Sequence, residues 1–162
     1  KNRNLTILIT WKSYSEITYQ ELMNRFYEND YSPYIQMQFL TPTAFKQKGK
    51  YLFYPDIRCI FQSLMNKYDS AICDESMMDM DTLEQLTENA HIIRYDLKSV
   101  GFCLEGVKIP AFIGKLTIKM NGTRTMSNFA NMLFEFGEYS GVGIKTALGM
   151  GCIKKIDERG RK

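Results

Sequence analysis

The residues best suited to chemistry lie between positions 140 and 151, in the stretch SGVGIKTALGMG. Two Gly-x-Gly pairs enclose a lysine and a threonine there: Gly141, Gly143, Lys145, Thr146, Gly149 and Gly151. Glycine reaches positive φ freely and lets another backbone come close. Successive exposed N–H groups in such a loop can form an anion-binding concavity. With the lysine charge added, the loop predicts a phosphate-binding site.

The loop differs from both common nucleotide-binding glycine motifs. Ile144 separates Gly143 from Lys145, whereas a Walker loop has glycine directly before its lysine. Thr146 stands where a dinucleotide fingerprint has its third glycine. The sequence predicts a helix before the loop and a strand after it, so the loop lies at the negative end of a helix dipole. A mononucleotide site prefers the opposite end, and a glycine C-cap with a tight turn is the alternative interpretation.

The other candidates are basic, aromatic and histidine side chains. Lys46, Lys48 and Lys50 either follow the phosphates of a nucleic acid or are solvated surface lysines. His91 is the one histidine, the residue type most often used as a general acid or base. A catalytic histidine also needs a hydroxyl or a cation beside it, so a structural role is the expectation. Four aromatic residues could stack on bases but are expected in the core: Tyr51, Phe53, Tyr54 and Tyr139.

The composition is that of a soluble globular protein, with 44% hydrophobic and 24% charged residues. The 162 residues suffice for one ordinary domain and part of another. No segment resembles a signal peptide or the ~20 apolar residues of a membrane span. The four cysteines, Cys59, Cys73, Cys103 and Cys152, are far apart and form no zinc motif. We therefore expect reduced cysteines, a cytoplasmic location, no membrane contact and neither a metal nor another cofactor.

Charge is unevenly distributed along the chain, although the net charge is only +3. Residues 71–90 contain six acidic and no basic residues, whereas the last nine residues contain five basic ones. This asymmetry is compatible with a polyanionic partner and equally with a solvated charged surface.

Hydrophobic periodicity predicts an α+β fold. The expected elements are a strand within 3–12, a helix at 18–26, a strand at 34–40, helices at 55–68 and 79–90, strands at 91–104 and 107–120, a helix around 129–136 and a strand at 152–156. From residue 33 onward this order is the ferredoxin-like (RRM-like) split βαβ fold, with an antiparallel sheet and helices on one face. The second strand of the 91–120 hairpin alternates apolar with lysine and threonine residues, so one face should be buried and the other basic.

Two motifs extend this interpretation. Residues 39–45 read FLTPTAF and are followed by Gly-Lys at 49–50 and Tyr-Pro-Asp at 54–56. This segment resembles the signature of the CRISPR-associated endoribonucleases that cut repeat RNA, the Cas-six family of the RAMP superfamily. The glycine loop at 141–151 resembles the C-terminal glycine-rich loop of the same family. The motifs lie about a hundred residues apart in the family's order, and the resemblance covers residues 33–157.

The resemblance implies two ferredoxin-like domains in tandem and binding of the CRISPR repeat in the precursor transcript. It further implies metal-independent cleavage, in which a 2′-hydroxyl attacks the adjacent phosphate and leaves a 2′,3′-cyclic phosphate and guide RNAs. The catalytic histidine of the family usually lies in the N-terminal domain. The partners implied are repeat RNA and other CRISPR effector subunits, and a homodimer is possible.

This sequence departs from the family pattern because only the C-terminal half is recognisable. Residues 1–30 are interpreted as a remnant of the N-terminal domain plus a linker, residues 31–157 as the C-terminal domain and residues 158–162 as a basic tail. The catalytic residues are thus expected outside this chain, with His91 a weak candidate, and the chain alone should not cleave RNA. The glycine-loop residues and the three lysines are the expected RNA contacts. A non-catalytic RNA-binding or scaffolding subunit, and an unrelated ferredoxin-like ligand-binding module, remain alternatives.

Overall fold

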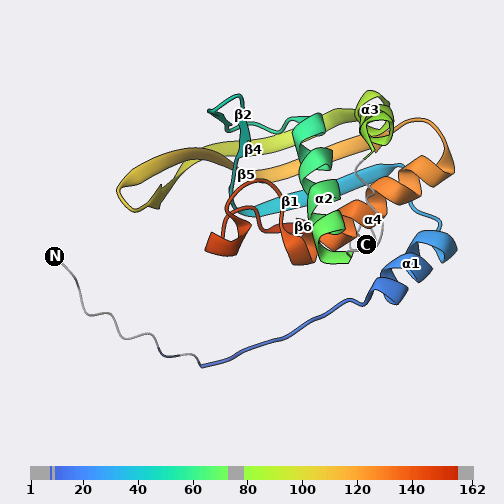
Figure 1. The fold of residues 1–162 in the computed structure, drawn as a ribbon, viewed down its shortest axis with the longest axis horizontal. Coiled ribbons are helices and arrows are strands. Elements are labelled where there is room, and N and C mark those ends of the chain that lie inside the picture. The colour runs from blue at the N-terminus through green and yellow to red at the C-terminus, as the bar shows by residue number, and fades with distance from the viewer. Residues whose placement is uncertain (1–7, 9, 73–78, 157–162) are drawn as a thin grey trace.

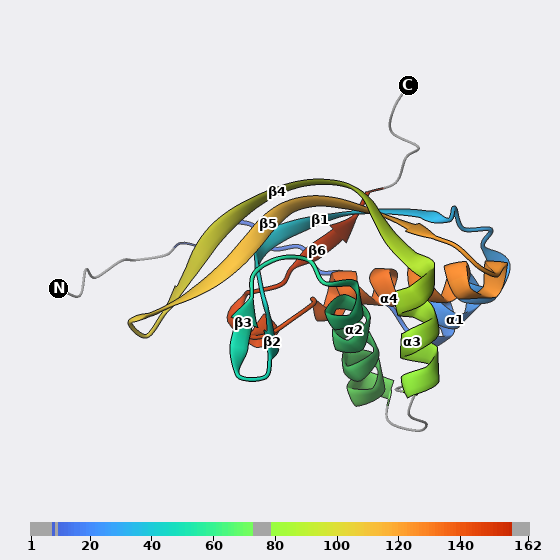
Figure 2. The same cartoon turned by 90° about the horizontal axis from the view of Figure 1, so that it is seen from above.

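The fold is an antiparallel sheet with a layer of helices on one face (Figures 1 and 2). It is known from a computed structural model that describes residue 8, residues 10–72 and residues 79–156. The elements are α1 (Tyr19–Glu28), β1 (Tyr34–Thr43), β2 (Phe45–Gln47), β3 (Lys50–Leu52), α2 (Ile57–Ile72), α3 (Met80–Asn89), β4 (Ala90–Leu104), β5 (Val107–Met120), α4 (Arg124–Ser140), a 3-10 turn at Thr146–Leu148 and β6 (Ile153–Lys155).

The main sheet has the strand order β4-β5-β1-β6, and each neighbouring pair is antiparallel. β1 therefore lies between β5 and β6, the strands that flank α4 in sequence, which is the arrangement of a split βαβ unit. The predicted α+β ferredoxin-like fold is confirmed. The predicted strand at 34–40 continues to Thr43 through an irregularity after Phe39. Residues 45–52 form a small hairpin, β2–β3, that the sequence did not predict.

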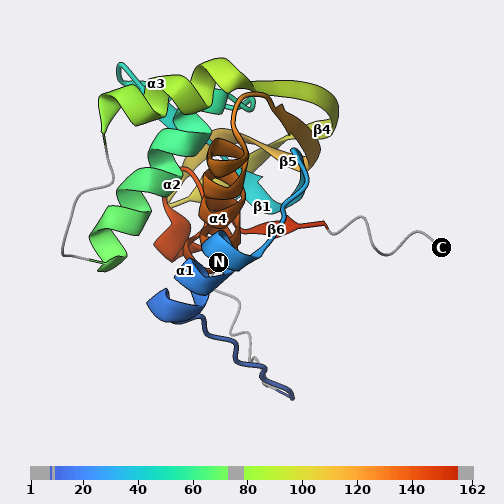
Figure 3. The same ribbon diagram turned by 90° about the vertical axis from the view of Figure 1, so that its right-hand side faces the viewer.

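One hydrophobic core fills the space between sheet and helices. β1 directs Ile35, Met37 and Phe39 into it, and these side chains are at most 1% exposed. The helices pack in the succession α1, α4, α2, α3 across the sheet, so α1 and α3 lie at opposite ends of the helical layer (Figure 3). None of the helices in the described ranges is long and apolar enough to cross a membrane.

The segment before β1 contributes one helix. Thr18 and Glu21 form a capping box that starts α1, and Leu22 joins the main core. Of the strand expected within 3–12, residues 1–7 and 9 lie outside the described residues. Leu8 and Trp11 are exposed and in no strand, so that element is not formed in the described part.

Candidate functional site

The glycine loop follows α4 directly and leads into β6. α4 ends at Ser140, and Gly141 with φ 70° turns the chain out of the helix. The loop contains one 3-10 turn at Thr146–Leu148. As predicted, the loop connects a helix to the last strand (Figure 1).

The loop directs several of its N–H groups toward the protein. The hydrogen bonds run from Val142 N to Gly151 O (2.8 Å), Gly143 N to Ser63 Oγ (2.8 Å), Ile144 N to Ala44 O (3.0 Å) and Gly151 N to Pro42 O (3.0 Å). These donors hold the loop against the end of β1 and against α2. The expectation of a cradle of outward N–H groups is therefore corrected for these four positions, because each N–H is already hydrogen-bonded within the protein.

The same packing requires glycine at two of the four glycine positions of the loop. Gly143 has φ 81°, and a Cβ there would overlap the carbonyl oxygen of Ala44. Gly151 has φ 72°, and a Cβ there would overlap the carbonyl oxygen of Val142. Close approach of backbone to backbone thus requires glycine, and this approach fixes the loop rather than a ligand.

Gly143→Ala should lower the free energy of unfolding by about 2 kcal/mol or more. About 1–2 kcal/mol comes from the left-handed backbone, and the overlap with Ala44 adds to it. Gly149→Ala is the matched control, because Gly149 has φ 89° but open space around its Cβ position. Urea unfolding of both variants gives the comparison. Equal losses would show that the contact with Ala44 contributes nothing.

Lys145 is the charged side chain that the loop presents to solvent, and Ala147 and Leu148 are exposed beside it. Lys145 is exposed and holds a left-handed backbone with φ 55°, a conformation uncommon for residues other than glycine. Thr146 beside it is half-buried, and its Oγ1 accepts a hydrogen bond from Lys67 Nζ at 2.7 Å. A rigid loop therefore holds one cation outward at a defined position.

The structure places the three predicted lysines of residues 46–50 beside the loop. Lys46, Lys48 and Lys50 are all exposed on the β2–β3 hairpin, which starts one residue after Ala44. Because Ile144 N–H binds Ala44 O, the hairpin and the loop lie at the same end of the sheet (Figure 2). The two sets of predicted residues, about a hundred positions apart, thus lie at one end of the sheet, and these four exposed lysines are here called the loop–hairpin surface: Lys46, Lys48, Lys50 and Lys145.

A second, smaller core supports this surface. Its buried members are Ala44, Ile109, Ala111 and Met150, with Tyr51, Val100, Phe102 and Ile144 packed against them. It joins the β2–β3 hairpin, the distal half of the β4–β5 hairpin and the glycine loop. The lysines therefore project from a packed platform.

The aromatic candidates divide into two groups. Tyr51 is half-buried against the second core, and Lys46 Nζ lies 5.9 Å from the centre of its ring. Phe53, Tyr54 and Tyr139 are 46%, 53% and 44% exposed, so the expectation of core positions is wrong for them. Phe53 and Tyr54 precede α2, which begins at Ile57, and both rings are about half exposed between the lysine hairpin and this helix.

His91 is not part of the loop–hairpin surface. It pairs with Lys119 on β5, which pairs with Tyr34 at the start of β1. The glycine loop instead contacts Pro42 near the end of β1. Eight positions at ~3.3 Å each separate these levels by roughly 25 Å, so His91 cannot act on a group bound at the loop.

The sheet face away from the helices is also basic, as strand alternation predicted for β5. The register adds residues from β4 and β6 that the sequence pattern missed. The basic residues of this open face are His91, Arg94, Lys98, Lys115, Lys119 and Lys154, with Asp96 as an acidic neighbour. Pairing between distant strands assembled the face, so the alternation in β5 carried only part of the signal.

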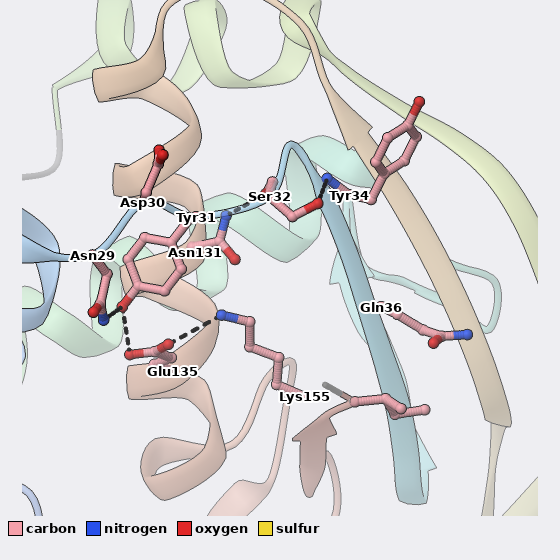
Figure 4. A pocket seen from close by; sticks show the side chains of 10 residues that line it. Asn29, Asp30, Tyr31, Ser32, Tyr34, Gln36, Asn131, Glu135 and Lys155 are labelled. Atoms are coloured by element: carbon pink, nitrogen blue, oxygen red, sulfur yellow. Dashed lines mark hydrogen bonds and ion pairs between the residues drawn. The ribbon is translucent and has the colours of Figure 1, made fainter. Parts of the chain in front are cut away.

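A polar pocket of about 560 Å³ lies between the linker before β1, α4 and β6 (Figure 4). Glu135 accepts from Lys155 Nζ and from Tyr31 OH, both at 3.0 Å, and Tyr31 OH accepts from Asn29 at 3.0 Å. Burial raises the pKa of Tyr31 to about 12. Lys155 and Glu135 form an ion pair in which each side chain is only 14% exposed, so the two buried charges neutralise one another. Through Tyr31, this network anchors the linker to α4 and β6.

Glu135→Gln should cost about 2 kcal/mol of stability, because it leaves the Lys155 charge largely buried without its carboxylate. Glu84→Gln is the control: its ion pair with Arg58 is exposed, with side chains 63% and 34% exposed. Such a pair contributes at most about 1 kcal/mol. Thermal unfolding at neutral pH compares the two. Equal effects would mean that the linker is held by packing alone.

The fold and the loop define a class, the ferredoxin-like domains with a C-terminal glycine-rich loop. The family model of the CRISPR-associated endoribonuclease Cas6 matches residues 37–153. A Cas6 endoribonuclease from Streptococcus thermophilus is 42% identical over 89% of this chain. One from Mycobacterium tuberculosis is 34% identical over 90% of it. The chain belongs to the Cas6 family.

The structural comparison agrees with the sequence comparison. A solved Cas6 product complex has a TM-score of 0.71 and 25% identity, covering 82% of this chain and 55% of that chain. Thermus thermophilus Cas6 has a TM-score of 0.67 at 24% identity, covering 76% of this chain and 53% of that one, and so supports the fold alone. The chain spans 59% of the Streptococcus relative and 46% of the Mycobacterium relative.

Proposed function

We propose that this chain is part of a CRISPR repeat-RNA endoribonuclease. In this proposal, the protein binds the repeat in the precursor transcript and cleaves it without a metal to give guide RNAs. The observation that carries the proposal is the loop–hairpin surface, which brings Lys145 together with Lys46, Lys48 and Lys50 on a rigid platform. Family membership supplies the substrate class.

The proposed chemistry divides between this chain and the rest of the protein. Attack by a 2′-hydroxyl needs a positioned base and stabilisation of charge on the phosphorane. Lys145 can supply the second. His91 lies roughly 25 Å along the sheet from the loop, so we place the general base in sequence that the longer relatives have and this chain does not span. The domain organisation we propose is accordingly a tandem one.

The glycines act indirectly in this proposal. Gly141, Gly143, Gly149 and Gly151 give the loop the shape that orients Lys145 and Thr146 toward RNA. Exposed Phe53 and Tyr54 are well placed to stack on unpaired bases. Other CRISPR effector subunits, or a second copy of the chain, are further proposed partners. The proposed location is the cytoplasm, and Cys59, Cys103 and Cys152 are free thiols.

A binding measurement tests the proposal. Fluorescence anisotropy should show that residues 1–162 bind repeat RNA from the source organism's CRISPR array more tightly than a scrambled RNA of equal length. Affinity should fall with salt, with a slope near 0.7 per phosphate contacted if the RNA is single-stranded there. Equal affinity for both RNAs would favour an unspecific RNA-binding module, and no binding would refute the proposal for this chain.

A further inference from the structure

A second pocket lies between α2 and the glycine loop, on the helical side of the loop–hairpin surface. It has a volume of about 290 Å³, close to the lower limit of ~300 Å³ for small-molecule sites. Its lining comes from β2, α2 and the loop, and its polar members are Lys46, Gln62, Ser63, Asn66 and Lys67, with Gly143 of the loop. Such a space suits a phosphate group with part of its ribose.

The pocket is positively charged. None of its lining residues is acidic, while Lys46 and Lys67 are both basic. Among the described residues neither lysine belongs to an ion pair of the kind that Lys155 makes. Lys67 is half-buried, and this burial lowers its pKa. A desolvated cation without a neighbouring carboxylate is expected to gain from an anionic ligand.

Two hydroxyl groups have hydrogens left to donate: that of Ser63 in the pocket lining and that of Thr146, which is bonded to Lys67 of the lining. Ser63 Oγ accepts from Gly143 N at 2.8 Å, and Thr146 Oγ1 accepts from Lys67 Nζ at 2.7 Å. Each hydroxyl is occupied as an acceptor and keeps its own hydrogen as a donor. Lys67 retains two further N–H groups.

The polar face of α2 adds to this set. Gln62 and Asn66 lie one helical turn apart, as do Ser63 and Lys67, so these four side chains share one side of the helix. Their amide, hydroxyl and ammonium donors face a pocket with no carboxylate in its lining. Phosphate oxygens, which are only acceptors when ionised, match such a donor set.

We propose that this pocket binds a phosphate group, and that in the working protein this is a backbone phosphate of the RNA strand that crosses the loop. The proposal rests on the proposed function for its choice of RNA. Lys46 connects the two surfaces, since it belongs both to the pocket lining and to the loop–hairpin surface. Lys67 becomes a phosphate-binding residue that also positions Thr146.

The test uses the 162-residue chain, repeat RNA and, separately, inorganic phosphate. Lys67→Gln should weaken repeat-RNA binding about fivefold and lower the salt slope by about 0.7. Lys67→Arg keeps the charge and should stay within about twofold of the parent chain. Lys12→Gln, which removes an exposed lysine outside the pocket, should leave both quantities unchanged. Side-chain amide NMR signals of Gln62 and Asn66 should shift when RNA is added.

The outcomes separate this proposal from the function on which it rests. If Lys145→Ala weakens RNA binding and Lys67→Gln does not, the pocket is refuted and the proposed function stands. If repeat RNA does not bind at all, the phosphate titration decides. Shifts at Gln62 and Asn66 would then support a free-phosphate or nucleotide site, and unchanged signals would overturn the pocket as well. Unfolding curves identify any variant that fails to fold.

Discussion

Purified residues 1–162 are expected to bind repeat RNA and to leave it intact. Loss of a general base alone slows such a reaction about 10²- to 10⁴-fold, and the one histidine of the sequence is distant from the loop. The measurement is a denaturing gel of end-labelled repeat RNA after prolonged incubation, with a chelator present. The Streptococcus thermophilus relative with its own repeat is the positive control.

Cleavage by this chain would move the proposed position of the active site. A product ending in a 2′,3′-cyclic phosphate would place the whole active site within residues 1–162. His91→Ala would then be the next variant, since His91 is the residue of this chain best suited to proton transfer near neutral pH. If the His91→Ala variant lost cleavage, the RNA would have to reach the open face of the sheet, where His91 lies.

Lys145→Ala is expected to weaken repeat-RNA binding by about 1 kcal/mol, or roughly fivefold, while the fold stays intact. The side chain is exposed, so its removal loses no core contact. One phosphate contact fewer should make the salt dependence shallower by about 0.7 for single-stranded RNA. In the longer protein the same change should also reduce cleavage. Anisotropy titrations at several salt concentrations provide the measurement.

Lys115→Ala is the matched control for this variant. Lys115 is an exposed lysine on β5, but it belongs to the open face of the sheet. If Lys115→Ala weakens binding and Lys145→Ala does not, the RNA lies on the open face. If Lys145→Ala melts the domain, the lysine is structural and the loop is a helix cap of unusual composition.

The sequence predicted the fold because each long element carries its own periodic signal. α2 buries one apolar face, α4 carries apolar residues through a stretch that is buried or half-buried from 126 to 137, and the turn at Glu105–Gly106 separates two long runs of strand residues. The β2–β3 hairpin escaped prediction because each strand has only three residues, too few for an alternating pattern. The glycine at position 49 was a turn signal in the sequence, and in the structure both Lys48 and Gly49 have positive φ.

The candidate site was only partly predictable. Residue types indicated Lys145 and the three lysines of the hairpin, but not that Ile144 N–H would join the two segments through Ala44. The role of the glycines could not be seen either, because the oxygen that excludes a Cβ at Gly143 belongs to a residue about a hundred positions earlier. The pocket at Lys67 depends likewise on contacts between α2 and the loop.

Photo-crosslinking would show which residues of the chain contact the repeat RNA. Repeat RNA carrying 4-thiouridine at successive positions would be irradiated with the 162-residue chain, and the attached peptides identified by mass spectrometry. We expect crosslinks within residues 45–54 and 141–151, where the loop–hairpin surface and the exposed rings of Phe53 and Tyr54 lie. Crosslinks confined to the open face, at residues of β4 and β5 such as Arg94 and Lys119, would contradict it.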